Sequence, residues 1–189
     1  CRPRKLPDSI MFASTHSSSA ATWNALSFDV EDYFHSSNFD ATISFDAWGS
    51  LESRVERNTR IILGILQSER VTATFFVLGW VAERFPGLVR EIADQGHEVG
   101  THSYRHRLVY NLAPDEFRAD LRKSIDLVEQ AAGQKVLGFR APSFSVTDKS
   151  LWALDVMKEE GLKYDSSIED VRRKVEADIE YIRTQSLLE

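Results

Sequence analysis

Gly96-His-Glu-Val-Gly-Thr-His102-Ser-Tyr-Arg-His106 is the stretch from which the rest of the chain is best interpreted. It places two imidazoles four residues apart, directly after a short apolar run. A helical turn would bring residues i and i+4 to one side, and neutral imidazole is a good ligand for zinc and similar cations. An isolated pair of this kind is more often a pair of surface histidines. The acidic cluster Asp29-Val-Glu31-Asp32 favours the metal interpretation, because two histidines and one carboxylate leave a coordination position open for water.

Outward from this stretch, the chain alternates between strand and helix patterns. Short apolar or β-branched runs predict strands over residues 24–29, 71–77, 97–100, 136–140 and 162–165. Apolar residues at helical spacing predict helices over residues 51–67, 80–95, 114–133 and 151–161. Residues 35–50 are expected to form a loop whose aromatic side chains pack rather than bind a ligand. The alternation implies an α/β fold with parallel strands, in a barrel or a doubly wound sheet.

Ionisable side chains follow the predicted strand ends, namely Asp29, Glu31, Asp32, His102, His106, Arg140 and Asp165. In a parallel α/β fold these ends gather on one face. One carboxylate and two histidines are therefore expected to meet around a divalent metal, with a second carboxylate left free. The metal would polarise a carbonyl and lower the pKa of bound water, and the free carboxylate would accept the proton.

Composition narrows the class of protein. A length of 189 residues, 42% hydrophobic and 28% charged, is ordinary for one globular domain. A formal net charge of −6 argues against nucleic acid as a partner. The only cysteine, Cys1, argues against a disulfide framework, and no apolar run approaches the ~20 residues of a transmembrane segment. These features leave the cellular compartment open.

The ends of the chain differ from its centre. Residues 1–22 are basic and then rich in serine, threonine and alanine, and are expected to be a flexible N-terminal segment. Residues 23–168 carry the α/β pattern and are expected to form the domain. Residues 169–189 are expected to form a charged amphipathic helix, with a narrow apolar stripe at Val171, Val175, Ile179 and Ile182.

Four ordered motifs resemble those of the polysaccharide deacetylase (NodB-homology) family, namely Ser-Phe-Asp29-Val-Glu31-Asp32, His102-Ser-Tyr-Arg-His106, Gly-Phe-Arg140-Ala-Pro142-Ser-Phe and Tyr-Asp165-Ser-Ser. The likeness covers about residues 25–168 and is closest to bacterial members associated with exopolysaccharide export and exosortase gene clusters. It implies a distorted, incomplete (β/α) barrel. It also implies a hydrolase, dependent on a divalent metal with Zn²⁺ as the expected ion, that removes N-acetyl groups from amino sugars of a polysaccharide.

The resemblance also implies roles for individual residues. Asp29 matches the catalytic base, and Arg140 matches the arginine that holds this base in place and keeps it ionised. His102 and His106 match the two metal histidines. The backbone N–H near Ser143 lies where the family forms its oxyanion donor.

The third metal ligand and several other polar residues are less directly matched. Glu31 is the first choice for the metal carboxylate, because a residue two positions after Asp29 in an extended segment points the same way. Asp32 is the alternative. Asp165 has no firm role, and His35 and His97 lie outside the motifs and are expected to be structural.

The chain departs from the family after the fourth motif. Family members carry a later histidine that protonates the leaving amine, but no histidine follows His106 here. The later barrel strands are expected to be missing as well, because the charged helix pattern follows Ile168 directly. Residues 171–182 instead resemble the tail of bacterial sugar-phosphate transferases, as expected for a truncated or fused reading frame. Loss of a general acid typically costs about 10²–10⁴-fold in rate.

Three functions therefore stay open at the level of sequence. The first is a deacetylase that acts on an acetylated polysaccharide or amino-sugar oligomer. The second is a catalytically impaired carbohydrate-binding or assembly module, associated with the proteins of an exopolysaccharide-export system. The third is a metal amidase that acts on a small amide.

Overall fold

The computed structural model describes residues 25–168, so the expectations for residues 1–22 and 169–189 lie outside the described part of the chain. Five parallel strands form one sheet in the sequential order β1-β2-β3-β4-β5. Their bounds are Ser27–Val30, Thr74–Val77, Glu98–Thr101, Gly138–Phe139 and Tyr164–Asp165. A doubly wound sheet reverses its strand order, whereas strands added in sequence build the wall of a barrel. The predicted α/β fold with parallel strands is confirmed.

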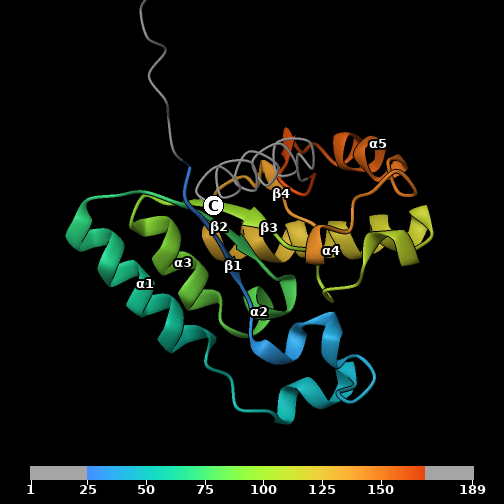
Figure 1. Cartoon of the computed structure of the whole chain (residues 1–189). Helices are drawn as coiled ribbons and strands as arrows, with labels where there is room; N and C mark the ends of the chain where they lie inside the picture. Colours follow the sequence, from blue (N-terminus) through green and yellow to red (C-terminus); the bar gives the residue numbers. More distant parts are fainter. Residues whose placement is uncertain (1–24, 169–189) are drawn as a thin grey trace, which may run out of the picture.

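In the described residues 25–168, five α-helices lie outside this sheet, with bounds α1 Val55–Glu69, α2 Gly79–Arg84, α3 Pro86–Asp94, α4 Pro114–Ala132 and α5 Trp152–Glu159. Figure 1 shows α1 and α3 on one flank of the sheet and α5 on the opposite flank. The longest helix, α4, packs against α2, α3, α5 and β3. Short 3₁₀ helices occupy the loops, namely η1 Tyr33–His35, η2 Ser37–Phe39, η3 Phe45–Ser50, η4 Val109–Asn111 and η5 Pro142–Phe144.

Two predicted helices differ from the observed ones. The helix predicted from residue 51 begins at Val55, because the backbone N–H of Arg54 and the hydroxyl of Ser53 are bound by the Asp32 carboxylate. The helix predicted over residues 80–95 is broken into α2 and α3 at Phe85. Pro86 follows the break and starts the second helix, as expected for a residue that cannot donate a helical hydrogen bond.

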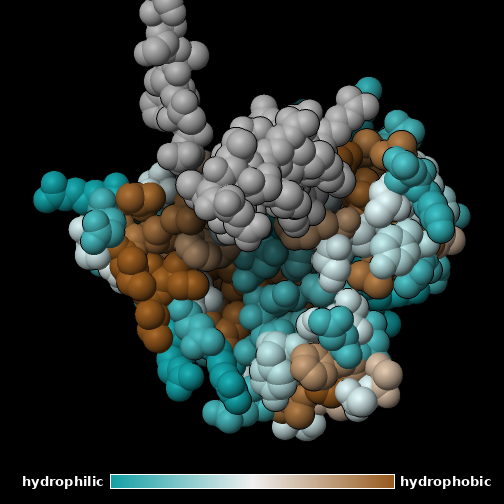
Figure 2. Space-filling model, viewed as in Figure 1, coloured by the Kyte–Doolittle hydropathy of each residue, from teal (hydrophilic) through white to brown (hydrophobic). Residues whose placement is uncertain are grey.

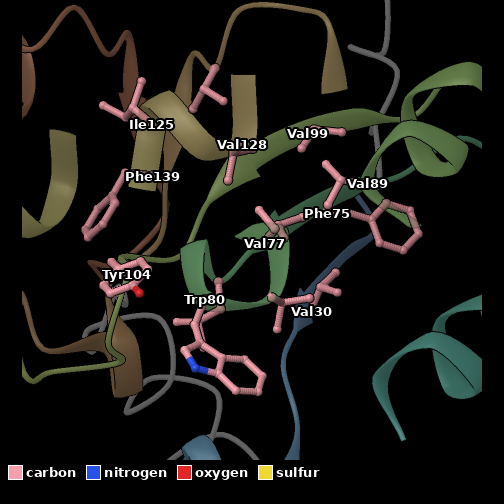
Figure 3. Packing of buried hydrophobic residues seen from close by; sticks show 14 of the residues in the cluster. Val30, Phe75, Val77, Trp80, Val89, Val99, Tyr104, Ile125, Val128 and Phe139 are labelled. Atoms are coloured by element: carbon pink, nitrogen blue, oxygen red, sulfur yellow. The ribbon is translucent and has the colours of Figure 1, made fainter. Parts of the chain in front are cut away.

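The core lies between the sheet and its helices. Figure 3 shows Val77 of β2 and Val99 of β3 gathered with Val89 of α3 and Val128 of α4. All four are at most 1% exposed. Burial of apolar area on this scale is the main term that stabilises a domain of this size.

The other face of the sheet is filled by Phe76, which explains two glycines. A Cβ on Gly100 would lie 2.7 Å from the Phe76 ring and 3.0 Å from the Gly138 carbonyl oxygen. A Cβ on Gly138 would meet the Tyr164 ring. Both glycines therefore leave space for aromatic rings on this face of the sheet. Strand β2 is buried on both faces, as is typical of a parallel strand with an unbroken apolar run.

The surface is uneven in hydropathy. Figure 2 shows a hydrophobic flank over α1, where Ile61 and Ile65 are exposed, and a hydrophilic band across the middle of the same face. Within residues 25–168, no helix is long and apolar enough to cross a membrane.

Candidate metal centre

Three side chains converge at the carboxyl ends of two strands. Glu31 follows β1, whereas His102 and His106 follow β3. Each offers one ligand atom, and these atoms all lie within 4.8 Å of one another. The Nε2 atom of His106 lies 3.1 Å from Oε2 of Glu31, and the two imidazole centroids are 5.2 Å apart. Both histidines are buried, while the Glu31 side chain is 25% exposed, so the cluster reaches solvent at its carboxylate.

The His102 ring is oriented by the backbone. Its Nδ1 lies 2.7 Å from the carbonyl oxygen of Arg140, so Nδ1 carries the proton and donates it. The lone pair is then on Nε2, which is the arrangement found when a backbone carbonyl orients a metal-binding histidine. Burial lowers the pKa of His102, and burial together with the neighbouring His102 lowers the pKa of His106 to about 3. Both imidazoles are therefore neutral, which is the form that binds metal.

The carboxylate of Glu31 lacks a compensating charge. Burial, followed by the charges of Asp29 and Asp32, raises the pKa of Glu31 to about 8. Its Oε2 and the Nδ1 of His106 are buried without a hydrogen-bond partner. A partly buried acid facing two neutral imidazoles fits a divalent cation.

The loop that carries the histidines is not a helical turn, although a helical turn would also bring residues four apart to one side. Strand β3 ends at Thr101, and the backbone then takes positive φ values at Ser103 (63°) and His106 (53°). The carbonyl of Ser103 accepts hydrogen bonds from Gly79 N–H and Ser124 Oγ, at 2.8 Å each, and so does not form an intrahelical bond. The two rings meet because neighbouring elements shape this loop.

Beside this cluster, Arg140 holds Asp29. Nη1 of Arg140 donates to Oδ1 of Asp29 at 2.9 Å, and Nη2 donates to Ser27 Oγ and Ser166 Oγ at 2.8 and 2.9 Å. The guanidinium carbon also lies 4.3 Å from the centroid of the Phe76 ring. The planar guanidinium of Arg140 is thus held by several contacts. It orients the carboxylate of Asp29, which is not part of the ligand cluster.

Asp32, the alternative ligand, points elsewhere. Its Oδ2 accepts from Ser53 Oγ at 2.6 Å, and its Oδ1 accepts from the Arg54 N–H at 2.8 Å. Both oxygens are therefore used in joining the β1 loop to the start of α1. The structure brings Glu31, and not Asp32, to the two histidines.

The remaining histidines predicted to be structural are packed among aromatic rings. His35 is fully buried, its ring lies 4.4 Å from Trp48 and 4.8 Å from Trp80, and its Nδ1 accepts the N–H of Asp32. Burial lowers the pKa of His35 to about 3. His97 is buried against Phe75 and accepts the N–H of Ala73.

Asp165 and Ser143 shape the neighbouring loops. Asp165 accepts from the N–H and the hydroxyl of Ser167, whose Oγ accepts the N–H of Ala141 at 2.6 Å. This network ties the end of β5 to the loop after β4. In that loop Ser143 and Phe144 both have positive φ, at 50° and 52°, and Ser143 Oγ lies 3.4 Å from Ser37 Oγ.

One residue of the site region, Asp120 of α4, was missed by the sequence analysis. Its Oδ2 accepts the N–H of Tyr104 at 2.7 Å, between the two histidines in sequence. The sequence does contain a signal for Asp120, because helical spacing places residue 120 on the same face as the buried Phe117 and Ser124. A charged residue within a buried helix face commonly has a specific partner.

Comparisons with known proteins agree with this arrangement. The family described as "Polysaccharide deacetylase" matches residues 36–164. The peptidoglycan-N-acetylglucosamine deacetylase of Bacillus cereus is 29% identical over 144 residues, which are 70% of this chain and 50% of that protein. The chain thus spans about half the length of this relative.

Two solved structures share the fold. A Mycobacterium smegmatis protein, provisionally named a polysaccharide deacetylase, is 29% identical with a TM-score of 0.64, over 77% of this chain and 51% of that one. A Bacillus anthracis protein, described as a pseudoenzyme of carbohydrate esterase family 4 (CE4), is 28% identical with a TM-score of 0.57, over 75% and 41%. With its family match over more than half of its length and the shared α/β fold, the chain belongs to the polysaccharide deacetylase family.

Proposed function

We propose that this chain carries the metal centre of a hydrolase that removes N-acetyl groups from amino sugars of a bacterial polysaccharide. The observation that supports this most strongly is the convergence of Glu31, His102 and His106 next to the Asp29–Arg140 pair. The relative from Bacillus cereus is named for the deacetylation of N-acetylglucosamine in peptidoglycan, which is a reaction of the same class.

The residues divide into ligands and a base. Glu31 and the two neutral imidazoles would hold a divalent cation, with Zn²⁺ the ion that their donor set favours. Such a cation supplies Lewis-acid polarisation of the amide carbonyl and lowers the pKa of water towards about 7. Asp29 lies outside the ligand set and is free to accept the proton of the attacking water.

Arg140 connects the two halves of this site. Its side chain positions the Asp29 carboxylate, and its backbone carbonyl orients the His102 ring. Arg140 therefore fixes the position of the base, Asp29, relative to the metal ligand His102. Pre-positioning of this kind lowers the barrier because little reorganisation is needed when the substrate reacts.

The polymer itself is part of the proposal. The likeness of the first motif to exopolysaccharide-associated members favours an acetylated exopolysaccharide, whereas the named relative acts on peptidoglycan. Acetate release should be measured with the full chain on acetylated exopolysaccharide, peptidoglycan and N-acetylglucosamine oligomers, with Zn²⁺ present or chelated.

The expected result is release that needs the metal and is lost in Asp29→Asn, while Asp32→Asn keeps it. Asp32→Asn is the matched control, because it removes a carboxylate from the same segment without touching the ligand cluster. Metal-independent release, or full activity in Asp29→Asn, would contradict the proposal.

A second function is favoured by one observation. The Bacillus anthracis structure that shares this fold is described as a pseudoenzyme of the CE4 family. On this alternative the chain is a carbohydrate-binding or assembly module, which associates with proteins of an exopolysaccharide-export system. Calorimetric binding of acetylated oligomers without release of acetate distinguishes this function from the first.

A further inference from the structure

Helix α4 presents a carboxylate to the loop between the two metal-site histidines. Oδ2 of Asp120 accepts the N–H of Tyr104 at 2.7 Å, and the N–H of the next residue, Arg105, favours the charged form of this carboxylate. Arg105 directly precedes His106. Asp120 itself touches neither histidine, so any effect it has on the centre acts through the backbone.

The same helix binds the preceding part of the loop one turn later. Ser124 Oγ donates to the carbonyl of Ser103 at 2.8 Å and lies 2.7 Å from Thr101 Oγ1. The Gly79 N–H donates to the same carbonyl from α2. The fit is close, because a Cβ on Gly79 would lie 2.6 Å from Ser124 Oγ. Residues 101–105 are thus held from two helices.

The loop needs this support because its backbone is strained. Ser103 and His106 have φ values of 63° and 53°, a region that residues other than glycine seldom occupy. Such conformations persist only where the surrounding contacts determine them. Without the hydrogen bonds from α2 and α4, we expect the loop to relax towards more common backbone angles and the His106 ring to move away from Glu31.

We propose that Asp120 is a positioning residue for the metal centre, which holds the 102–106 loop in the conformation that brings His106 to His102 and Glu31. This inference rests on the proposed function, since it requires that these three side chains bind a metal. Helix α4 is anchored in the core independently by Phe117, Leu121 and Val128, so the carboxylate is not needed to attach the helix.

The test compares metal binding with loop protection in the full chain. Asp120→Asn keeps the size of the side chain but replaces one acceptor by a donor that opposes the backbone N–H groups. We expect its Zn²⁺ affinity, from competition with a chelating dye, to fall about 10–100-fold, the range found when partners of metal ligands are removed. The absorption spectrum of bound Co²⁺ should change, and amide hydrogen exchange at residues 104 and 105 should accelerate in the metal-free protein.

Matched variants separate positioning from general stability. Asp126→Asn removes the same charge from an exposed position of α4 and should leave affinity and spectrum unchanged. Asp120→Glu, which restores the acceptor, should recover part of the affinity, and Ser124→Ala should weaken binding independently. Where Asp120→Ala does not fold, the isosteric Asp120→Asn still provides the comparison.

The outcomes distinguish this inference from the proposed function. Wild-type protein that binds no Zn²⁺ or Co²⁺ overturns both. Wild-type protein that binds metal, with Asp120→Asn within twofold of its affinity and with the same Co²⁺ spectrum, overturns the role of Asp120 alone.

Discussion

At the scale of single residues, two neighbouring acids of the first motif have different tasks. The Oε2 atom of Glu31 is buried without a hydrogen-bond partner, and the side chain faces the two imidazoles. Asp32 is buried as a whole, but both of its oxygens accept hydrogen bonds from the segment that leads into α1. One acid is therefore available to a cation, while the other has a structural role.

Substitution should separate these tasks. Glu31→Gln should weaken Zn²⁺ binding by at least tenfold with a small effect on folding, because it removes the only carboxylate of the cluster. Asp32→Asn should keep the metal affinity but lower the free energy of unfolding by about 1.5–3 kcal/mol, the range for a hydrogen bond to a charged group. Dye competition and urea unfolding measure the two effects. The assignment is wrong if Asp32→Asn is the variant that loses metal.

Arg140 offers a second test at this scale. Arg140→Lys keeps the charge and the backbone carbonyl but loses the planar fork that reaches Asp29, Ser27 and Ser166 together. We expect kcat for acetate release to fall about 10²-fold, as for a poorly placed base, with Zn²⁺ affinity almost unchanged. A variant that loses metal affinity and kcat in parallel would indicate that the side chain mainly maintains the fold.

At the scale of elements, short 3₁₀ helices place exposed aromatic rings around the site. Tyr33 and Phe39, from η1 and η2, are 47% and 40% exposed, and Phe144 of η5 is 47% exposed. The Ser37–Ser143 contact joins η2 to η5, and the Arg140 guanidinium lies 5.7 Å from the Phe144 ring. Exposed rings beside a reactive pair are suited to stack on the apolar faces of sugar rings.

This arrangement predicts a dependence on substrate length. Phe144→Ala should raise KM for N-acetylglucosamine oligomers about 2–10-fold, in line with the modest free energy of one aromatic contact, while kcat changes little. The kinetics of a small acetylated substrate should be unaffected, since it does not extend to the ring. Equal effects on both substrates would mean that Phe144 supports the loop of Arg140 instead of binding sugar.

At the scale of the whole molecule, buried titratable groups make stability and metal binding depend on pH. The pKa of Glu31 is raised to about 8, so the folded state holds a proton there that the unfolded state releases above about 4.5. Its contribution to stability is lost as pH rises towards 8. His35 and His106, with pKa values lowered to about 3, act in the opposite direction, and their contribution is lost as pH falls below 6.5.

Metal binding should follow the Glu31 proton. Between pH 6 and pH 7.5 a cation must displace this proton, so Zn²⁺ affinity should rise by up to about tenfold per pH unit and level off above pH 8. His106, with its pKa lowered to about 3, contributes no further slope in this range, and burial lowers the pKa of His102 in the same direction. Titrations in buffers of different ionisation enthalpy measure the released proton. Affinity that is flat from pH 6 to pH 8 would show that Glu31 is not the group displaced.

The sequence alone determined the alternation of strands and helices and the parallel sheet. It also determined that ionisable residues gather at the strand ends. These properties follow from which positions along the chain are apolar, as in the buried run of β2. The spacing of apolar residues indicates which side of a strand or helix is buried. The chain's order of motifs also identified its family correctly, because their residues recur at fixed places in the fold.

The tertiary structure alone decided how the site residues are held in place. Asp32 does not face the histidines, because its carboxylate accepts hydrogen bonds from Ser53 and Arg54. The loop of His106 is held by hydrogen bonds to Asp120 and Ser124 of α4. These hydrogen bonds join residues far apart in the chain, so no local pattern encodes them. A spacing of four residues is compatible with a helical turn, but the backbone takes the conformation that its long-range partners stabilise.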